Sequence, residues 1–183
     1  ASPRWRRLGI EAEALVMPTA YAAIDAVLAP ALAGGFDAVL MIGVAGRARR
    51  VRVERRAANR ASLLSPDVER RRRTAPALAP GASHRISRAG ATAALARLRR
   101  AGIPCRLSRD AGRYLCNASY FAALAAPMPG AVPAHPRPPR QRPRRPGAKP
   151  ARLGWHERLA EAFVDVAVDL LGAARHGAAR RDS

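Results

Sequence analysis

The chain has 183 residues, 49% hydrophobic and 25% charged, which is enough to bury one sizeable core. Its formal charge of +20 would ordinarily indicate a polyanion-binding protein. However, Lys149 is the only lysine and alanine is abundant, so a codon-composition bias explains the many arginines as readily. Aromatic residues make up only 4%, which disfavours stacking on single-stranded nucleic acid. We therefore expect no specific nucleic-acid partner, and no membrane span because no apolar run of about 18 residues occurs.

The first half of the chain predicts a strand, a helix, two further strands and a solvated loop, at residues 10–17, 18–32, 37–43, 47–59 and 69–73. The helix should end at Gly34 and Gly35, because glycine commonly follows a helix end. The continuous apolar run 37–43 is typical of a central parallel strand that is covered on both faces.

The second half predicts a helix, a strand, a buried helix, a short strand and a C-terminal helix, at residues 88–101, 103–108, 116–124, 130–135 and about 155–174. Strands that alternate with helices favour an α/β fold, here a three-layer α/β/α sandwich with a largely parallel central sheet. We interpret residues 1–183 as a single domain. Its proline- and arginine-rich stretch, about 127–150, is expected to be an extended surface loop rather than a basic interaction arm.

Cys116 begins the buried helix predicted at residues 116–124, which makes it the candidate nucleophile. A thiol at a helix N-terminus lies near free backbone N–H donors and the positive end of the helix dipole, and both favour the thiolate. We therefore expect iodoacetamide to alkylate Cys116 below neutral pH and to leave Cys105 unmodified. The alternative interpretation is that Cys116 is a small buried apolar residue.

A nucleophilic cysteine needs a base and a third group that orients the base. His135 is the candidate base, because it ends a short strand that follows the helix of Cys116. Glu54, near the end of a predicted strand, is the candidate third group, although it could equally be a surface glutamate beside arginines. The remaining histidines, in a loop, at a helix start and in an arginine-rich tail, are interpreted as solvated: His84, His156 and His176.

Three segments carry a resemblance: residues 54–59 followed by Pro66 and Asp67, residues 111–117, and residues 42–46. They are similar, in that order, to the glutamate motif, the nucleophile motif and the glycine-rich loop of the pyroglutamyl peptidase I family, the C15 cysteine peptidases. The similarity extends, with gaps, from about residue 10 to about residue 170.

The resemblance implies a hydrolase of the thiol protease class that removes N-terminal pyroglutamyl residues from peptides through a thioester acyl-enzyme. It implies Cys116 as nucleophile, His135 as base and Glu54 as the acid of the triad. It implies no cofactor, and two cysteines make no zinc pattern. The residues it implies around the triad are Cys116, Asn59 and Asn117 as oxyanion donors or supports, and Gly43, Val44 and Ala45 as pocket lining.

Two other hypotheses remain open. The chain could be a family member with impaired or changed activity, because Leu64 stands where the family has an arginine and because the chain starts at Ala1 without the family's N-terminal strand and pocket loop. It could also be a basic polyanion-binding protein, on charge alone. Two cysteines form no disulfide framework and a thiol nucleophile needs a reducing compartment, so we expect a cytoplasmic protein. The family resemblance and an incomplete sheet edge both favour homo-oligomers.

Overall fold

A computed structural model of the protein describes residues 3–44, 48–81, 83–87, 90–126, 130–135 and 154–179. The central sheet has the strand order β1 (Ala38–Ile42), β6 (Gly130–His135), β2 (Val51–Glu54) and β5 (Cys105–Ser108). The pairs β1–β6 and β2–β5 are parallel, whereas β2 and β6 are antiparallel. The predicted α/β class with a largely parallel sheet is therefore confirmed.

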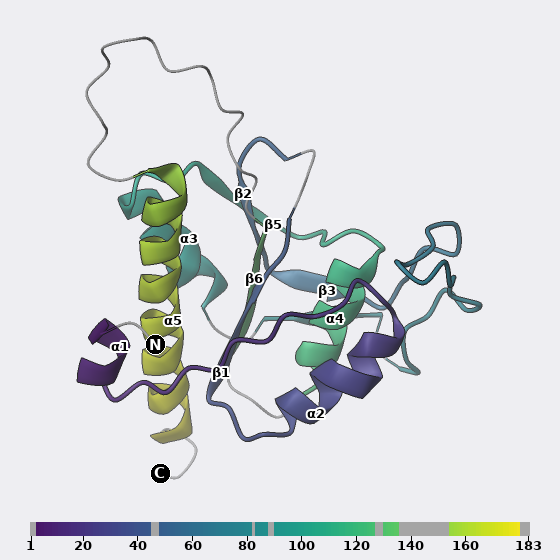
Figure 1. The fold of residues 1–183 in the computed structure, drawn as a ribbon, viewed down its shortest axis with the longest axis horizontal. Helices are drawn as coiled ribbons and strands as arrows, with labels where there is room; N and C mark the ends of the chain where they lie inside the picture. Colours follow the sequence, from purple (N-terminus) through teal and green to yellow (C-terminus); the bar gives the residue numbers. More distant parts are fainter. Residues whose placement is uncertain are drawn as a thin grey trace.

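Helices cover both faces of this sheet, as Figure 1 shows. One face carries α3 (Ala91–Arg100) and α5 (Trp155–Ala179). The other carries η1 (Ile24–Leu28), which continues directly as α2 (Ala29–Leu32), together with α4 (Leu115–Ala123). Alternate residues of β1 contact the two sides, because successive side chains of a strand point to opposite faces. This arrangement confirms the three-layer sandwich.

The larger core lies between the sheet and the pair α3 and α5. Val51 and Val53 of β2 are buried there against Leu98 of α3. The buried residues of α5 recur at the helical spacing that the sequence predicts for its inner face: Leu159, Ala162, Phe163, Val166 and Leu170. At the edge of this core, Arg97 of α3 and Asp169 of α5 form a bidentate ion pair, with 2.9 Å from Nε to Oδ2 and 2.7 Å from Nη2 to Oδ1.

Several expected elements differ from the structure. Residues 10–17 form no strand and are largely exposed, with Val16 92% exposed, because no described strand offers them backbone partners. Figure 1 shows this segment crossing from the side of α1 (Pro3–Arg7) to the side of α2. Strand β1 lies at the edge of the described sheet rather than at its centre, so its residues are only partly buried.

The strand predicted over residues 47–59 is two strands. The chain leaves the central sheet after Glu54, and β3 (Arg56–Ala58) then pairs antiparallel with β4 (His84–Ile86) in a separate two-stranded sheet. His84 therefore lies in a strand and not in a loop. The sequence reveals no break at this point, since both sides of Arg55 have the composition of a strand.

The C-terminal predictions are confirmed where the structure describes them. Strand β6 has the predicted bounds, and α5 begins at Trp155 and continues past residue 174 to Ala179. The expected loop at 127–150 falls, apart from β6, outside the described residues. In the part of the chain that the structure describes, no helix has the length and apolar character required to cross a membrane.

Asn117 fastens α4 to β3. Its buried side chain accepts the Ala58 N–H at 2.8 Å and donates to the carbonyls of Ala58 and Arg60 at 2.8 and 2.9 Å. Leaving these partly buried backbone groups without partners would cost free energy, because water can replace the lost bonds only in part. Asn117 thus fixes the start of the Cys116 helix against the chain that follows Glu54.

We expect Asn117→Ala to lower the free energy of unfolding by about 2–3 kcal/mol, since a buried side chain is truncated and three partly buried backbone groups lose their partner. Urea denaturation at pH 7 measures this change. Ser119→Ala, on a less buried position of the same helix, serves as the control and should change stability by less than about 0.5 kcal/mol. Equal effects of the two substitutions would contradict the fastening role of Asn117.

Candidate active site

The candidate site lies where the carboxyl ends of β2 and β5 meet the start of α4. Glu54 ends β2 and Ser108 ends β5, and the two residues are partners in the parallel register. Cys116 is the second residue of α4. Ligand and catalytic sites of α/β sheets commonly form at the carboxyl ends of strands. The structure therefore brings the predicted nucleophile and the predicted acid to one region.

A tight turn places Cys116 at the helix start. Gly112 has a φ of +83°, a conformation that glycine adopts readily, and its N–H donates to Asp110 Oδ1 at 2.9 Å. The first intrahelical bonds of α4 run from the N–H groups of Asn117 and Ala118 to the carbonyl of Tyr114. The N–H of Cys116 precedes these bonds and lies beside its own thiol, where it favours the thiolate.

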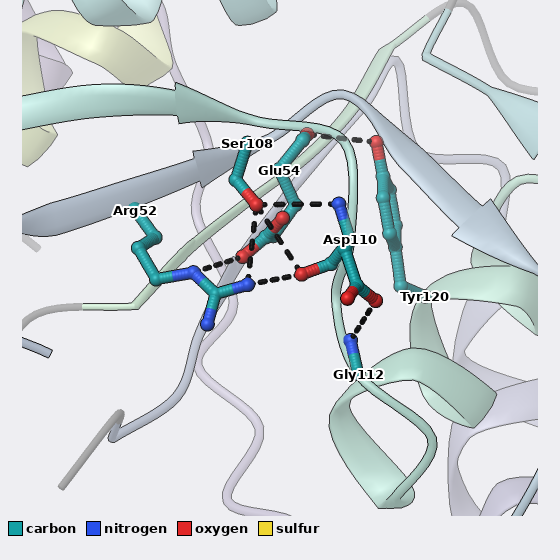
Figure 2. Close-up of polar contacts among 6 residues, drawn as sticks. All are labelled: Arg52, Glu54, Ser108, Asp110, Gly112 and Tyr120. Atoms are coloured by element: carbon teal, nitrogen blue, oxygen red, sulfur yellow. Dashed lines mark hydrogen bonds and ion pairs between the residues drawn. The ribbon is translucent and has the colours of Figure 1, made fainter. Parts of the chain in front are cut away.

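The side chain of Glu54 is completely buried. Figure 2 shows the guanidinium of Arg52 beside its carboxyl group. Arg52 Nε lies 3.0 Å from Glu54 Oε1. Neither carboxylate oxygen accepts a well-aligned hydrogen bond from the described residues. Burial raises the pKa of Glu54 above its ordinary value, and the nearby Ser108 hydroxyl and Arg52 oppose that rise only in part. Oε2 thus remains available to a further donor.

Tyr120 ties the helix of Cys116 to the strand of Glu54. Its hydroxyl, buried in the molecule, donates to the Glu54 backbone carbonyl at 3.1 Å. Because residues four positions apart lie on the same helix face, Cys116 is on the face of α4 that meets β2. The charge of Glu54 is near enough to raise the pKa of the Cys116 thiol.

The pKa of the Cys116 thiol differs from the sequence expectation. Burial raises it most, its own backbone N–H lowers it, Glu54 raises it and Arg52 lowers it, and the result lies above the ordinary value. The helix start acts in the expected direction but is outweighed, because the thiol is half-buried beside a carboxylate. Thiolate formation in these surroundings therefore needs a proton acceptor. Cys105 is also buried, at the opposite end of β5, and burial raises its pKa.

His135 ends β6 and is the direct partner of Arg52 in the antiparallel register. Arg52 and Glu54 are two residues apart on β2 and so share a face of the sheet. The backbone thus places the His135 position one strand away from Glu54. Of the other histidines, His84 is exposed and its Nδ1 lies 3.0 Å from Ser83 Oγ, while His156 is exposed with its ring against Trp155.

The other residues of the resembling motifs hold loops in place. Asn59 accepts the N–H groups of Leu78 and Ala79 and donates to the Ala79 carbonyl at 2.6 Å. Asp67 accepts backbone N–H groups of three residues: Tyr21, Glu69 and Arg71. Burial alone would raise the pKa of Asp67, but these N–H groups outweigh it and lower the pKa. The supporting and oxyanion roles of Asn59 and Asn117 remain predictions.

The predicted pocket lining is only partly described. Gly43 and Val44 follow β1 directly, and Val44 is 73% exposed, while Ala45 lies outside the described residues. A depression of about 400 Å³ opens elsewhere, at the amino end of β5, beside Arg50 and Arg99. It is not the candidate active site, because Glu54 and Ser108 occupy the other end of these strands.

Sequence reasoning did not identify four residues that shape the site: Arg52, Ser108, Asp110 and Tyr120. Two of them could have been found from spacing. Arg52 shares a strand face with Glu54, and Tyr120 shares a helix face with Cys116. The contributions of Ser108 and Asp110 depend on the pairing of β2 with β5, which no local pattern reveals.

Comparison with known proteins identifies the family of this chain. The sequence profile described as pyroglutamyl peptidase matches residues 9–128. The crystal structure of pyrrolidone carboxyl peptidase from Thermus thermophilus is 30% identical, with 84% of this chain and 79% of that chain covered and a TM-score of 0.68. A mutant enzyme from Pyrococcus furiosus shares 22% identity, covers 85% and 79% of the two chains and has a TM-score of 0.68.

The pyrrolidone carboxyl peptidase of Fervidobacterium islandicum shares 23% identity, with 72% and 70% of the two chains covered and a TM-score of 0.63. No curated protein matches the sequence. At 22–23% identity the last two structures support the fold alone, whereas the profile covers more than half of the chain and the Thermus enzyme covers most of it at higher identity. The chain belongs to the pyroglutamyl peptidase family of cysteine peptidases.

Proposed function

We propose that this chain removes N-terminal pyroglutamyl residues from peptides with a triad of Cys116, His135 and Glu54. The observation that carries the proposal is the buried carboxylate of Glu54, whose Oε2 accepts no well-aligned hydrogen bond from the described residues. A buried carboxylate whose charge Arg52 and Ser108 compensate only in part is costly to keep, so a further donor with a functional role is the natural complement. The ring N–H of His135 is that donor in our proposal.

The chemistry follows from the surroundings of the thiol. Because burial raises the pKa of Cys116, the resting thiol keeps its proton until His135 accepts it. Cys116 Sγ then attacks the pyroglutamyl carbonyl, and His135 returns the proton to the departing amine as the C–N bond breaks. Water, deprotonated by His135, hydrolyses the thioester and releases pyroglutamate and the free thiol. Glu54 stabilises the imidazolium in both steps.

Two sources of rate enhancement belong to this scheme. Proton transfer by a positioned base contributes roughly 10²–10⁴-fold. The backbone N–H of Cys116, at the helix start, is the proposed oxyanion donor, and one such donor increases the rate roughly 10²–10³-fold.

Both cysteines are free thiols, which agrees with the reducing cytoplasm that we propose as the site of action.

A second candidate, a family member with impaired or changed activity, is favoured by Leu64. The resemblance implies an arginine there, whereas the Leu64 side chain is 82% exposed and carries no donor. Losing a charge-assisted donor at the reacting carbonyl would cost several kcal/mol of transition-state stabilisation, on the order of 10²-fold in rate or more. The measurement of turnover decides between the two candidates.

We expect the purified protein to release the fluorophore from a pyroglutamyl-amide substrate and Cys116→Ala to abolish that release, because the nucleophile is lost. Cys105→Ala is the matched control, since this thiol lies at the far end of β5, and it should retain turnover. Failure of the unsubstituted protein to turn over the substrate would instead favour the second candidate.

We expect His135→Ala to lower kcat/KM by roughly 10²–10⁴-fold and to move alkylation of Cys116 by iodoacetamide to alkaline pH. The reason is that burial raises the pKa of the thiol and no base then offsets it. The matched control is His84→Ala, an exposed histidine on β4, which should leave both measurements unchanged. An unchanged alkylation profile in His135→Ala would exclude this histidine as the base.

The ionised carboxylate of Glu54 should lower the free energy of unfolding, although the proposed activity needs this group. Because the folded-state pKa of Glu54 is raised, its contribution to stability is fully present below the ordinary glutamate pKa of about 4.3 and is lost as pH rises through the folded-state pKa. Glu54→Gln should therefore gain stability relative to the unsubstituted protein between pH 4 and pH 7, while it loses activity.

Urea denaturation at several pH values across this range measures the gain. The control is Glu69→Gln, which removes an exposed carboxylate paired with Arg71 and should change stability by less than about 0.5 kcal/mol. A Glu54→Gln variant whose relative stability falls as pH rises would show that the ionised carboxylate stabilises the fold.

A further inference from the structure

Arg52 forms an ion pair with Glu54 and two further hydrogen bonds around it. Its Nε lies 3.0 Å from Glu54 Oε1, and its Nη2 donates to Ser108 Oγ at 3.1 Å and to the carbonyl of Asp110. Figure 2 shows the guanidinium bridging β2 to the turn that leads into α4. About a quarter of its side chain, 27%, is exposed. These acceptors hold the planar guanidinium in one orientation. A fully exposed ion pair, by contrast, contributes little to stability.

The contact uses only one oxygen of Glu54. Arg52 forms an ion pair with Oε1, whereas no described cation pairs with Oε2, and neither oxygen accepts a well-aligned hydrogen bond from the described residues. The register also sets Arg52 directly opposite His135, so the arginine lies beside the position of the proposed base. A cation on Oε1 therefore orients the carboxylate without taking the oxygen that the base needs.

The charged and titratable groups around Glu54 come from each packed element: Arg52 on β2, Arg106 on β5, Asp110 in the following turn, Cys116 and Tyr120 on α4, and the His135 position on β6. Arg52 is the one that forms an ion pair with Glu54 among the described residues. Arg106 carries the same charge and is the register partner of Arg52, yet it makes no described ion pair with Glu54.

We propose that Arg52 is a positioning residue of this active site: its guanidinium fixes Glu54 Oε1, holds the buried carboxylate ionised and leaves Oε2 for the catalytic base. The inference deepens the proposed function and rests on it for the role of Glu54. It also gives the site a partly buried cation, although Leu64 provides none at the position where the resemblance implies an arginine. Arg52 acts through Glu54, so its effect should appear in the titration of that carboxyl.

The test follows the Glu54 carboxyl carbon by NMR in the full chain labelled with ¹³C-glutamate, with Glu54→Gln identifying the resonance. Arg52→Gln should increase the proton affinity of Glu54 about tenfold, because the one cation that pairs with it among the described residues is lost while burial remains. Arg106→Gln, which removes the same charge from the neighbouring strand, should change it by less than about twofold. Arg52→Lys, which keeps the charge but not the planar contacts, should give an intermediate value.

A titration of Glu54 in Arg52→Gln that equals that of the unsubstituted protein, or that of Arg106→Gln, overturns the proposal. If Arg52→Gln does not fold, Arg52→Lys decides, and an unchanged titration there overturns the proposal equally. A merely structural arginine would lower stability without moving the titration in the folded protein.

Turnover is scored separately, so the two proposals can fail independently. If the unsubstituted protein does not hydrolyse the pyroglutamyl substrate, the proposed substrate is refuted. If the Glu54 titration nevertheless shifts in Arg52→Gln, the positioning role is supported. Where turnover is present, the acid limb of the kcat/KM profile should move to higher pH in Arg52→Gln and stay in place in Arg106→Gln.

Discussion

The burial of the Glu54 carboxylate is the constraint on which the rest of the site depends. A carboxylate taken out of water loses a large solvation energy, and the protein must offset that loss with a cation or hydrogen bonds. Here the compensation is incomplete: Arg52 pairs with one oxygen, and burial still raises the pKa of the group. The fold holds Glu54 in place nevertheless, because it lies in a strand whose neighbouring valines are packed in the larger core.

The same arrangement links the proposed nucleophile to the proposed acid through backbone contacts. Tyr120 donates to the Glu54 carbonyl, and Asn117 fastens the start of α4 to the strand just beyond. Cys116 directly precedes Asn117 and lies about one helical turn before Tyr120, so these hydrogen bonds set its position relative to β2. An active site built in this way gives up some stability for position, as is common where buried polar groups serve chemistry.

Local patterns were a good guide wherever an element is decided by its own residues. The inner face of α5, the bounds of β6 and the start of the Cys116 helix follow from apolar spacing and from the turn at Gly112. Local patterns were a poor guide where strand pairing decides which structure a segment forms. Residues 10–17 have alternating character but no strand partner, and the chain leaves the central sheet at Arg55 without any local signal.

By itself the sequence determined the α/β class, the candidate triad and the family, because motif spacing and hydrophobic periodicity are properties of short segments. Only the tertiary structure decided that β1 is an edge strand, that Arg52 reaches the buried carboxylate and Ser108 at once, and that burial outweighs the helix start at Cys116. These outcomes depend on which strands pair and how deeply a group is buried, and both are set by contacts between residues far apart in the chain.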